Sequence, residues 1–138
     1  MDFTRRIIMV NTAYRQFIQN KLRENNTDLT FEMLQVLACL WNEDGINQQE
    51  IANITVKDKA SITYLIDNLV KRDLVYRVED SNDRRNKLIH LTKQGMKTQE
   101  HIQPFLDDMY KIAGAGIDNE LLQQCMAVIG QVEQNLKA

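Results

Sequence analysis

Apolar residues recur every three to four positions along almost the whole chain, and this helical spacing changes to strand alternation at one place. The exception is residues 74–91, where the runs LVYRV and KLIHL flank the turn-rich EDSNDRRN. Two short strands alone are marginally stable in water, so this hairpin is expected to pack against helices. The sequence therefore predicts a mainly α fold with a small two-stranded β-hairpin.

Amphipathic stripes predict helices on both sides of the hairpin. Thr30, Asn47 and Thr92 each precede such a stripe and are expected to cap the helix that follows, because their side chains accept hydrogen bonds from free backbone N–H groups. The expected helices lie in residues 2–24, 29–45, 46–55 and 59–72, and then from 92 and from about 118 onward.

The charges are unevenly distributed. Residues 55–97 hold ten Lys or Arg against six Asp or Glu, whereas the rest of the chain holds seven against thirteen, for a net charge of −2. A basic middle in an acidic chain indicates a localised contact with a polyanion, although a chance fluctuation of solvated charges remains the alternative.

Several classes of protein are disfavoured by the composition. No apolar run approaches the roughly 18 residues of a membrane span, and the start lacks a signal-peptide pattern, so a cytoplasmic location is expected. Cys39 and Cys125 lie far apart in apolar segments, and His90 and His101 are isolated, so no disulfide, metal site or other cofactor is expected. We find no nucleophile with a base, no paired carboxylates and no phosphate loop, and therefore expect no enzyme.

Residues 47–72 have the spacing of a helix-turn-helix, with two helices joined by a short turn and a polar outward face on the second. The second helix of such a motif can lie in the major groove of DNA. The hairpin that follows would then be a wing.

The stretch from Gln48 to Gly95 resembles the winged-helix core of the MarR family of bacterial transcriptional regulators. The most specific part is the order of a strand with arginine, Asp80, the triplet 83–85 (DRR), a second strand and the run LTKQG at 91–95. The resemblance extends over essentially all 138 residues. It implies one domain (1–138), with a winged helix-turn-helix lobe at about 30–92 and dimerisation helices at about 1–25 and 93–138.

The resemblance also implies roles for the hairpin residues. Arg85 would reach into the minor groove, and Arg84 and Lys87 would meet phosphates. Asp83 would hold Arg77 and so pre-set the loop. The alternative for the triplet is a solvated turn that serves solubility.

Further DNA contacts are expected from the polar face of the fourth helix. Hydroxyl, amide and ammonium groups can contact phosphates or base edges there, and the candidates are Lys59, Ser61, Thr63, Tyr64 and Asn68. Two positions depart from the family pattern. Tyr64 stands where many MarR-like proteins have arginine, and Asp73 stands where glycine usually ends the helix, although Asp tolerates the left-handed conformation.

The terminal helices are expected to form a homodimer because their stripes are too apolar to stay uncovered, with an intramolecular bundle as the alternative. The resemblance implies a small, often aromatic effector in a cleft lined by Tyr14, Phe17, Trp41 and Tyr110, although all four also suit a core. Redox control is not expected, because no cysteine lies near the first helix and Cys39 should be buried and inert.

The function that follows is a sequence-specific DNA-binding transcriptional regulator of a palindromic operator, expected to be a repressor that an effector releases. A winged helix used for protein contacts, without DNA binding, is the alternative. The basic hairpin tip favours DNA, because a protein-binding wing has no need of two adjacent arginines.

Overall fold

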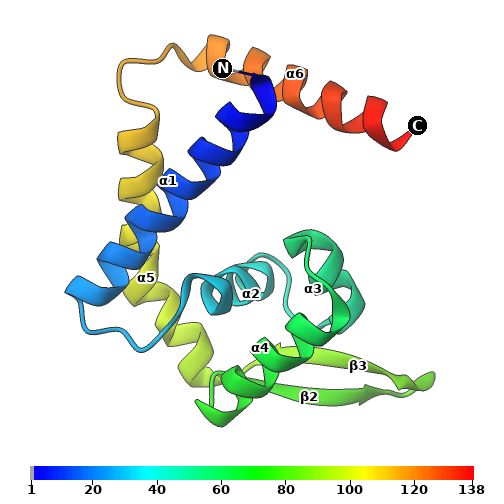
Figure 1. Cartoon of the computed structure of the whole chain (residues 1–138). Helices are drawn as coiled ribbons and strands as arrows, with labels where there is room; N and C mark the ends of the chain where they lie inside the picture. The colour runs from blue at the N-terminus through cyan, green and yellow to red at the C-terminus, as the bar shows by residue number, and fades with distance from the viewer. Residues whose placement is uncertain (1) are drawn as a thin grey trace. The chain divides into compact units, whose positions relative to one another are not determined.

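The computed structural model describes residues 2–138. Helices precede and follow a small sheet along the chain (Figure 1). In chain order the elements are α1 (Phe3–Glu24), α2 (Phe31–Asn42), β1 (Ile46–Asn47), α3 (Gln48–Thr55), α4 (Lys59–Lys71), β2 (Val75–Asp80), β3 (Asp83–Leu91), α5 (Lys93–Ala113) and α6 (Asn119–Lys137). The predicted mainly α fold is confirmed.

The chain forms two compact units that divide inside α5. The first ends at Phe105 and the second is Leu106–Ala138, so the boundary lies one residue beyond Pro104, which is within the helix. A proline in a helix interior removes one hydrogen bond of the helical ladder. The boundary therefore falls where the backbone of α5 is less continuously bonded.

Polar residues cap α2, α3 and α4, and the sequence predicts the first two of these caps. The Thr30 side chain accepts a hydrogen bond from the Met33 N–H, and the Asn47 side chain accepts one from the Glu50 N–H. Asp58 caps α4 in the same way and accepts from the Ser61 N–H at 2.7 Å. This third cap is absent from the sequence-based prediction, which assigns Asp58 to a polar turn.

The sheet has three strands rather than the predicted two, in the order β1-β3-β2 with antiparallel pairing. The extra strand is the dipeptide Ile46–Asn47, which pairs with Ile89 and Leu88 of β3. Gly45 brings the chain to this edge with φ +75, and a Cβ there would meet the His90 ring at 2.8 Å. Two residues carry no alternation pattern, so this strand depends on tertiary pairing alone.

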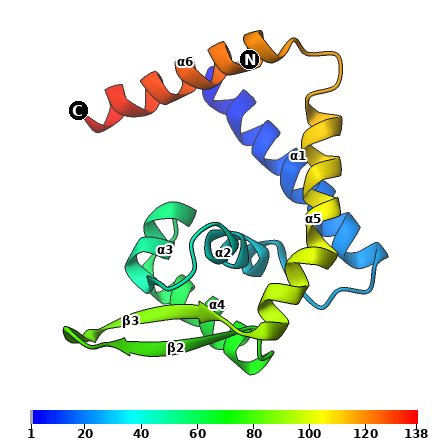
Figure 2. The same ribbon diagram turned by 180° about the vertical axis from the view of Figure 1, so that it is seen from behind.

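One core joins α2, α3 and α4 to the hairpin, and Figures 1 and 2 show α4 lying across the hairpin. Burying a large aliphatic side chain contributes about 1.5–3 kcal/mol, so this shared core fixes where α4 and the hairpin lie. Its fully buried members include Val36, Leu37, Ile51, Ile62, Ile66, Leu69 and Ile89.

The first turn of α5 approaches the end of α4 very closely. Asp73 adopts the left-handed conformation with φ +57, as predicted for an aspartate in place of glycine. Thr92 caps α5 by accepting from the Gly95 N–H at 3.0 Å, and its hydroxyl donates to the Asp73 carbonyl at 2.6 Å. A Cβ on Gly95 would lie 2.1 Å from the Leu74 carbonyl oxygen, so this position requires glycine.

Helix α1 is tied to the start of α2 by an ion pair. Arg15 donates to the Glu32 carboxylate and lies over the Phe31 ring at 4.9 Å from its centroid. Burial raises the pKa of Glu32, but the hydrogen bonds from Arg15 and the backbone and the charges of Arg15 and Lys57 outweigh it and hold the pKa below its usual range. Glu32 is therefore ionised where it meets Arg15.

The terminal helices expose much of their apolar surface. No residue of α6 is buried, and its exposed apolar side chains are Leu121, Leu122, Met126, Val128, Ile129 and Leu136. The first half of α1 likewise exposes Phe3, Ile7, Ile8, Met9 and Val10. Such stripes are unusual on a monomeric surface.

Of the helices in residues 2–138, none has the length and apolarity that a membrane crossing requires.

Replacement of Gly95 by alanine should destabilise the protein strongly. The added methyl group meets backbone at 2.1 Å rather than a side chain that can rotate away, so we expect Gly95→Ala to lower the free energy of unfolding by about 3 kcal/mol. Urea unfolding followed by circular dichroism measures this loss.

Gly130→Ala is the matched control, because a Cβ there meets nothing within 4 Å. Alanine in a helix interior is favoured over glycine by up to about 1 kcal/mol, so this variant should be no less stable than the wild type. Equal urea midpoints for the two variants would contradict the proposed close approach.

Candidate nucleic-acid interface

The exposed face of α4 is one half of the candidate site. Ile62, Leu65, Ile66 and Leu69 are buried on the opposite face. On the free face Lys59 and Ser61 are exposed, Tyr64 is 68% exposed, and Thr63 and Asn68 are half-buried. The helix thus presents a polar surface that its apolar side holds in place.

Hydrogen bonds within the lobe already engage three of the five predicted α4 residues. The Thr63 hydroxyl donates to the Lys59 carbonyl at 3.0 Å, and the Asn68 amide donates to the Tyr64 carbonyl at 2.9 Å. The Ser61 backbone N–H, and then its hydroxyl, donate to Asp58 and lower the pKa of that carboxyl. The side chains of Lys59 and Tyr64 have no such partner among residues 2–138, so the ammonium and phenol groups remain available.

The turn between β2 and β3 is the other half of the site, and two aspartates organise it. Asp80 accepts from the Asn82 N–H and from the Asn86 amide, both at 3.0 Å, and these bonds, the Asn82 bond first, lower its pKa. Asp83 accepts from the Arg85 N–H at 3.0 Å. The loop is therefore shaped by its own side chains.

β3 carries three cationic side chains, of which two are unpaired and one forms an ion pair. Arg84 and Arg85 are exposed, and neither guanidinium forms an ion pair within the described part of the chain. Lys87 pairs with Glu79, directly across the hairpin, at 2.7 Å. Two unpaired guanidinium groups thus lie at the tip, where they can bind an anion without first breaking an ion pair.

The predicted contact between Asp83 and Arg77 is wrong. Arg77 instead donates to Asp67 of α4 at 2.6 Å and to Gln48 of α3 at 3.0 Å, while Asp83 accepts from the Arg85 backbone. Arg77 pairs across the hairpin with buried Ile89, near the core, whereas Asp83 lies at the turn. Their separation along the strand prevents contact.

A small cleft lies between the hairpin and the helices. Its volume is about 220 Å³, and it is lined by Lys59 of α4, Gln48 of α3, and Arg85 and Lys87 of β3, among others. Three of these side chains are cations from two separate elements. This arrangement can hold a phosphate-sized anion by charge and hydrogen bonds.

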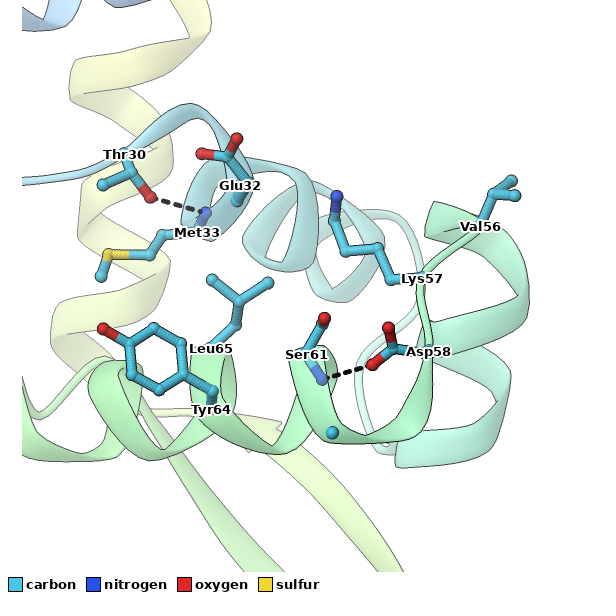
Figure 3. A pocket seen from close by; sticks show the side chains of 10 residues that line it. Thr30, Glu32, Met33, Val56, Lys57, Asp58, Ser61, Tyr64 and Leu65 are labelled. Atoms are coloured by element: carbon cyan, nitrogen blue, oxygen red, sulfur yellow. Dashed lines mark hydrogen bonds between the residues drawn. The ribbon is translucent and has the colours of Figure 1, made fainter.

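A larger, open groove of about 760 Å³ borders α4 on its other side (Figure 3). Tyr64 and Leu65 line it from α4, and Glu32 and Lys57 lie at its far wall in Figure 3. No local sequence pattern predicts this groove, because it joins the start of α2 to the turn before α4.

The four predicted effector residues lie in different surroundings. Trp41 is half-buried against the core, and its indole N–H donates to the Gly95 carbonyl at 3.0 Å. Tyr14 and Phe17 are half-buried on α1, and the Lys21 ammonium lies 5.6 Å from the Phe17 ring centroid. Tyr110 is 65% exposed in the second unit. Both the groove and the cleft are lined by other residues.

Sequence reasoning missed two residues of this region, Gln48 and Asp67. Both contact Arg77 from elements that are distant in sequence. Asp67 follows Thr63 by four residues and therefore shares its helix face. This spacing could have indicated that Asp67 belongs to the site. Gln48 offered no signal beyond its place directly after the Asn47 cap.

Comparison with known proteins identifies the relatives of this lobe. The family model described as "MarR family" matches residues 29–87, which contain the helix-turn-helix and most of the hairpin. The HTH-type transcriptional regulator FarR of Neisseria gonorrhoeae is 26% identical over 117 residues, covering 83% of this chain and 80% of FarR. SarZ of Staphylococcus aureus strain USA300 is 34% identical over 68 residues, covering 49% of this chain and only 46% of SarZ.

Solved structures extend the likeness to the whole chain. The MepR protein of S. aureus in its DNA-binding conformation superposes with a TM-score of 0.88 at 26% identity, covering 99% of both chains. MepR in a complex with DNA gives a TM-score of 0.86 at the same identity, covering 98% of both. Residues 29–87 are therefore similar to the MarR family, and the chain as a whole has the fold of these two MepR structures.

Proposed function

We propose that this protein is a sequence-specific DNA-binding regulator, with α4 in the major groove and the hairpin tip at the minor groove. The observation that carries the proposal is the exposed, unpaired state of Arg84 and Arg85 beside the polar face of α4. The solved complex of MepR with DNA supports it, because MepR shares this fold.

Each side chain has a proposed role that follows from its chemistry. Arg85 enters the minor groove, where negative potential is concentrated, and Arg84 contacts phosphate. Lys59 and Lys87 hold a phosphate at the small cleft, although Lys87 must share its charge with Glu79. Tyr64 reads base edges, since its hydroxyl both donates and accepts.

We also propose DNA contacts for Ser61, Thr63 and Asn68, and expect them to contribute less than those of Tyr64 and the arginines. Their polar groups bond within the lobe, so a DNA contact must share a hydrogen bond with the existing partner. The main discrimination is therefore assigned to Tyr64.

We propose further that the protein acts as a homodimer on a palindromic operator. The apolar stripes of α1 and α6 need a cover, and a two-fold pair covers identical stripes with each other. The pair also supplies two copies of α4, as a palindrome requires.

The proposed outcome in the cell is repression of a promoter in the cytoplasm, relieved by a small aromatic effector that lies near Tyr14, Phe17 and Trp41 of the first unit. Release requires that the effector bind the DNA-free arrangement of the dimer more tightly than the bound one. A winged helix that binds a protein instead of DNA remains the second candidate, and salt-dependent duplex binding separates the two.

Arg85→Ala should weaken binding to every duplex, because the lost contact is electrostatic. Loss of one cation that neutralises charge on the duplex lowers the slope of log Kd against log salt by about 0.9. Fluorescence anisotropy with a duplex from the region upstream of the gene, measured between low and moderate salt, gives both the affinity and the slope.

Arg23→Ala is the control, since Arg23 lies on α1 and bonds to Asn20 of the same helix. It removes the same charge from the chain but should leave the slope unchanged. A wild-type protein that binds no duplex at low salt would refute DNA binding and favour the protein-interaction alternative.

Ile129→Glu should convert a dimer into monomers. Ile129 is 46% exposed on the apolar stripe of α6, and a carboxylate buried at an interface there would lack a partner. Sedimentation velocity should give about twice the 16.1 kDa chain mass for the wild type and about that mass for the variant. Gln131→Glu, off the stripe, should stay dimeric, and a monomeric wild type would refute the dimer.

An aromatic carboxylic acid that acts as effector should raise the melting temperature and release the operator duplex. Phe17→Ala should lose both responses, because Phe17 is a proposed lining residue, and Phe105→Ala should retain them. A thermal-shift screen followed by anisotropy measures both. Responses that survive Phe17→Ala would place the effector elsewhere.

A further inference from the structure

Gln48 lies where three elements meet, and its side chain bonds to two of them. It is the first residue of α3. Its carbonyl oxygen accepts from the Arg77 Nε at 3.0 Å, and its amide nitrogen donates to the Thr63 hydroxyl at 3.2 Å. Arg77 belongs to β2 and Thr63 to α4. One amide therefore bridges the hairpin and the candidate recognition helix.

An ion pair closes the bridge into a ring. Arg77 donates through Nη2 to Asp67 at 2.6 Å, and Asp67 lies one helical turn beyond Thr63 on α4. The Thr63 hydroxyl in turn donates a hydrogen bond to the Lys59 carbonyl at 3.0 Å. We call Gln48, Thr63, Asp67 and Arg77 the bracket.

The bracket sits at the place where the hairpin leaves the core. Val75 and Leu91 pair at the base and are buried, and Arg77 pairs with buried Ile89 one rung further. The next rung on this face is Glu79 with Lys87, which bond to each other. Within residues 2–138, no hydrogen bond beyond the bracket ties the hairpin to a helix.

We infer that Gln48 is a positioning residue, which sets the angle between the hairpin and α4 and thereby the distance from the arginine tip to Tyr64. This inference rests on the proposed DNA binding, because the two parts must reach adjacent grooves at once. Arg77 then acts through the bracket, and a DNA contact by Thr63 must share its hydroxyl with Gln48.

The chemistry of an amide fits this role. A glutamine side chain donates and accepts simultaneously, so it satisfies a hydroxyl and a guanidinium together. The Arg77 side chain is 27% exposed and that of Asp67 is 50% exposed, so water screens their charges and the ion pair alone holds the hairpin weakly. The neutral bridge adds two directional bonds without another charge near DNA.

The test compares two glutamines that each form side-chain hydrogen bonds. Gln48→Met keeps length and removes both bonds of the bridge. Gln131→Met removes an amide that donates to Asn135 of its own helix, α6, at 2.8 Å, outside the proposed DNA interface. We expect Gln48→Met to raise the Kd for an operator duplex about tenfold, as loss of a hydrogen bond to a charged group does. Gln131→Met should stay within about twofold of the wild type.

Two further readouts separate positioning from folding. Melting temperatures should agree within about 2 °C, since the bracket lies outside the core. Hydrogen exchange at the backbone amides of residues 79–87 and at the Arg77 Nε should accelerate in Gln48→Met alone. A double variant with Arg77→Met should bind no worse than Arg77→Met, because both changes break one network.

Equal operator affinity of the Gln48→Met and wild-type proteins would overturn the inference, and so would a loss of affinity that merely follows a lowered melting temperature. Failure of the proposed function looks different, because the wild type itself would then bind no duplex. In that case the exchange rates still decide whether Gln48 holds the hairpin.

Discussion

The DNA-binding lobe depends on one shared core, in which the apolar side of α4 is buried together with Ile89 of the hairpin. Because the same side chains hold both elements, the polar face of α4 and the basic turn are fixed at their bases and left free at their outer surfaces. Neither element needs to be stable alone. The helix is positioned by its neighbours, and a two-residue strand at the sheet edge completes the packing.

The distribution of charge explains how an acidic chain can bind a polyanion. Arg15, Arg72, Arg77 and Lys87 each meet a carboxylate, and these pairs shape the lobe. Arg84 and Arg85 extend from the turn without one. The field is therefore positive locally, while the overall negative charge disfavours indiscriminate attachment to nucleic acid.

Much of the fold follows from local patterns, and the remainder depends on contacts between distant residues. Helical spacing and the caps at Thr30, Asn47 and Thr92 were sufficient to place helices, and Asp73 behaves as its chemistry indicates. The strand β1 exists because β3 offers it a partner. The contact between Asp83 and Arg77 that the resemblance implies does not form, because Asp83 lies at the turn and Arg77 lies near the core. The true partners, Asp67 and Gln48, lie 10 and 29 residues away. The contacts of α4 and the hairpin with DNA remain proposals. The residue types determine which groups could bind DNA, but not which of these side chains touch it.

Helix α6 spans 19 residues and buries none of them within its own chain. An isolated helix of this length is marginal in water, and most helical stability in proteins comes from tertiary packing. If the partner copy supplies that packing, completion of the helix and association of the subunits are a single equilibrium. The amount of competent regulator would then rise more steeply than the amount of chain synthesised, so a modest change in expression would give a sharper change in promoter occupancy.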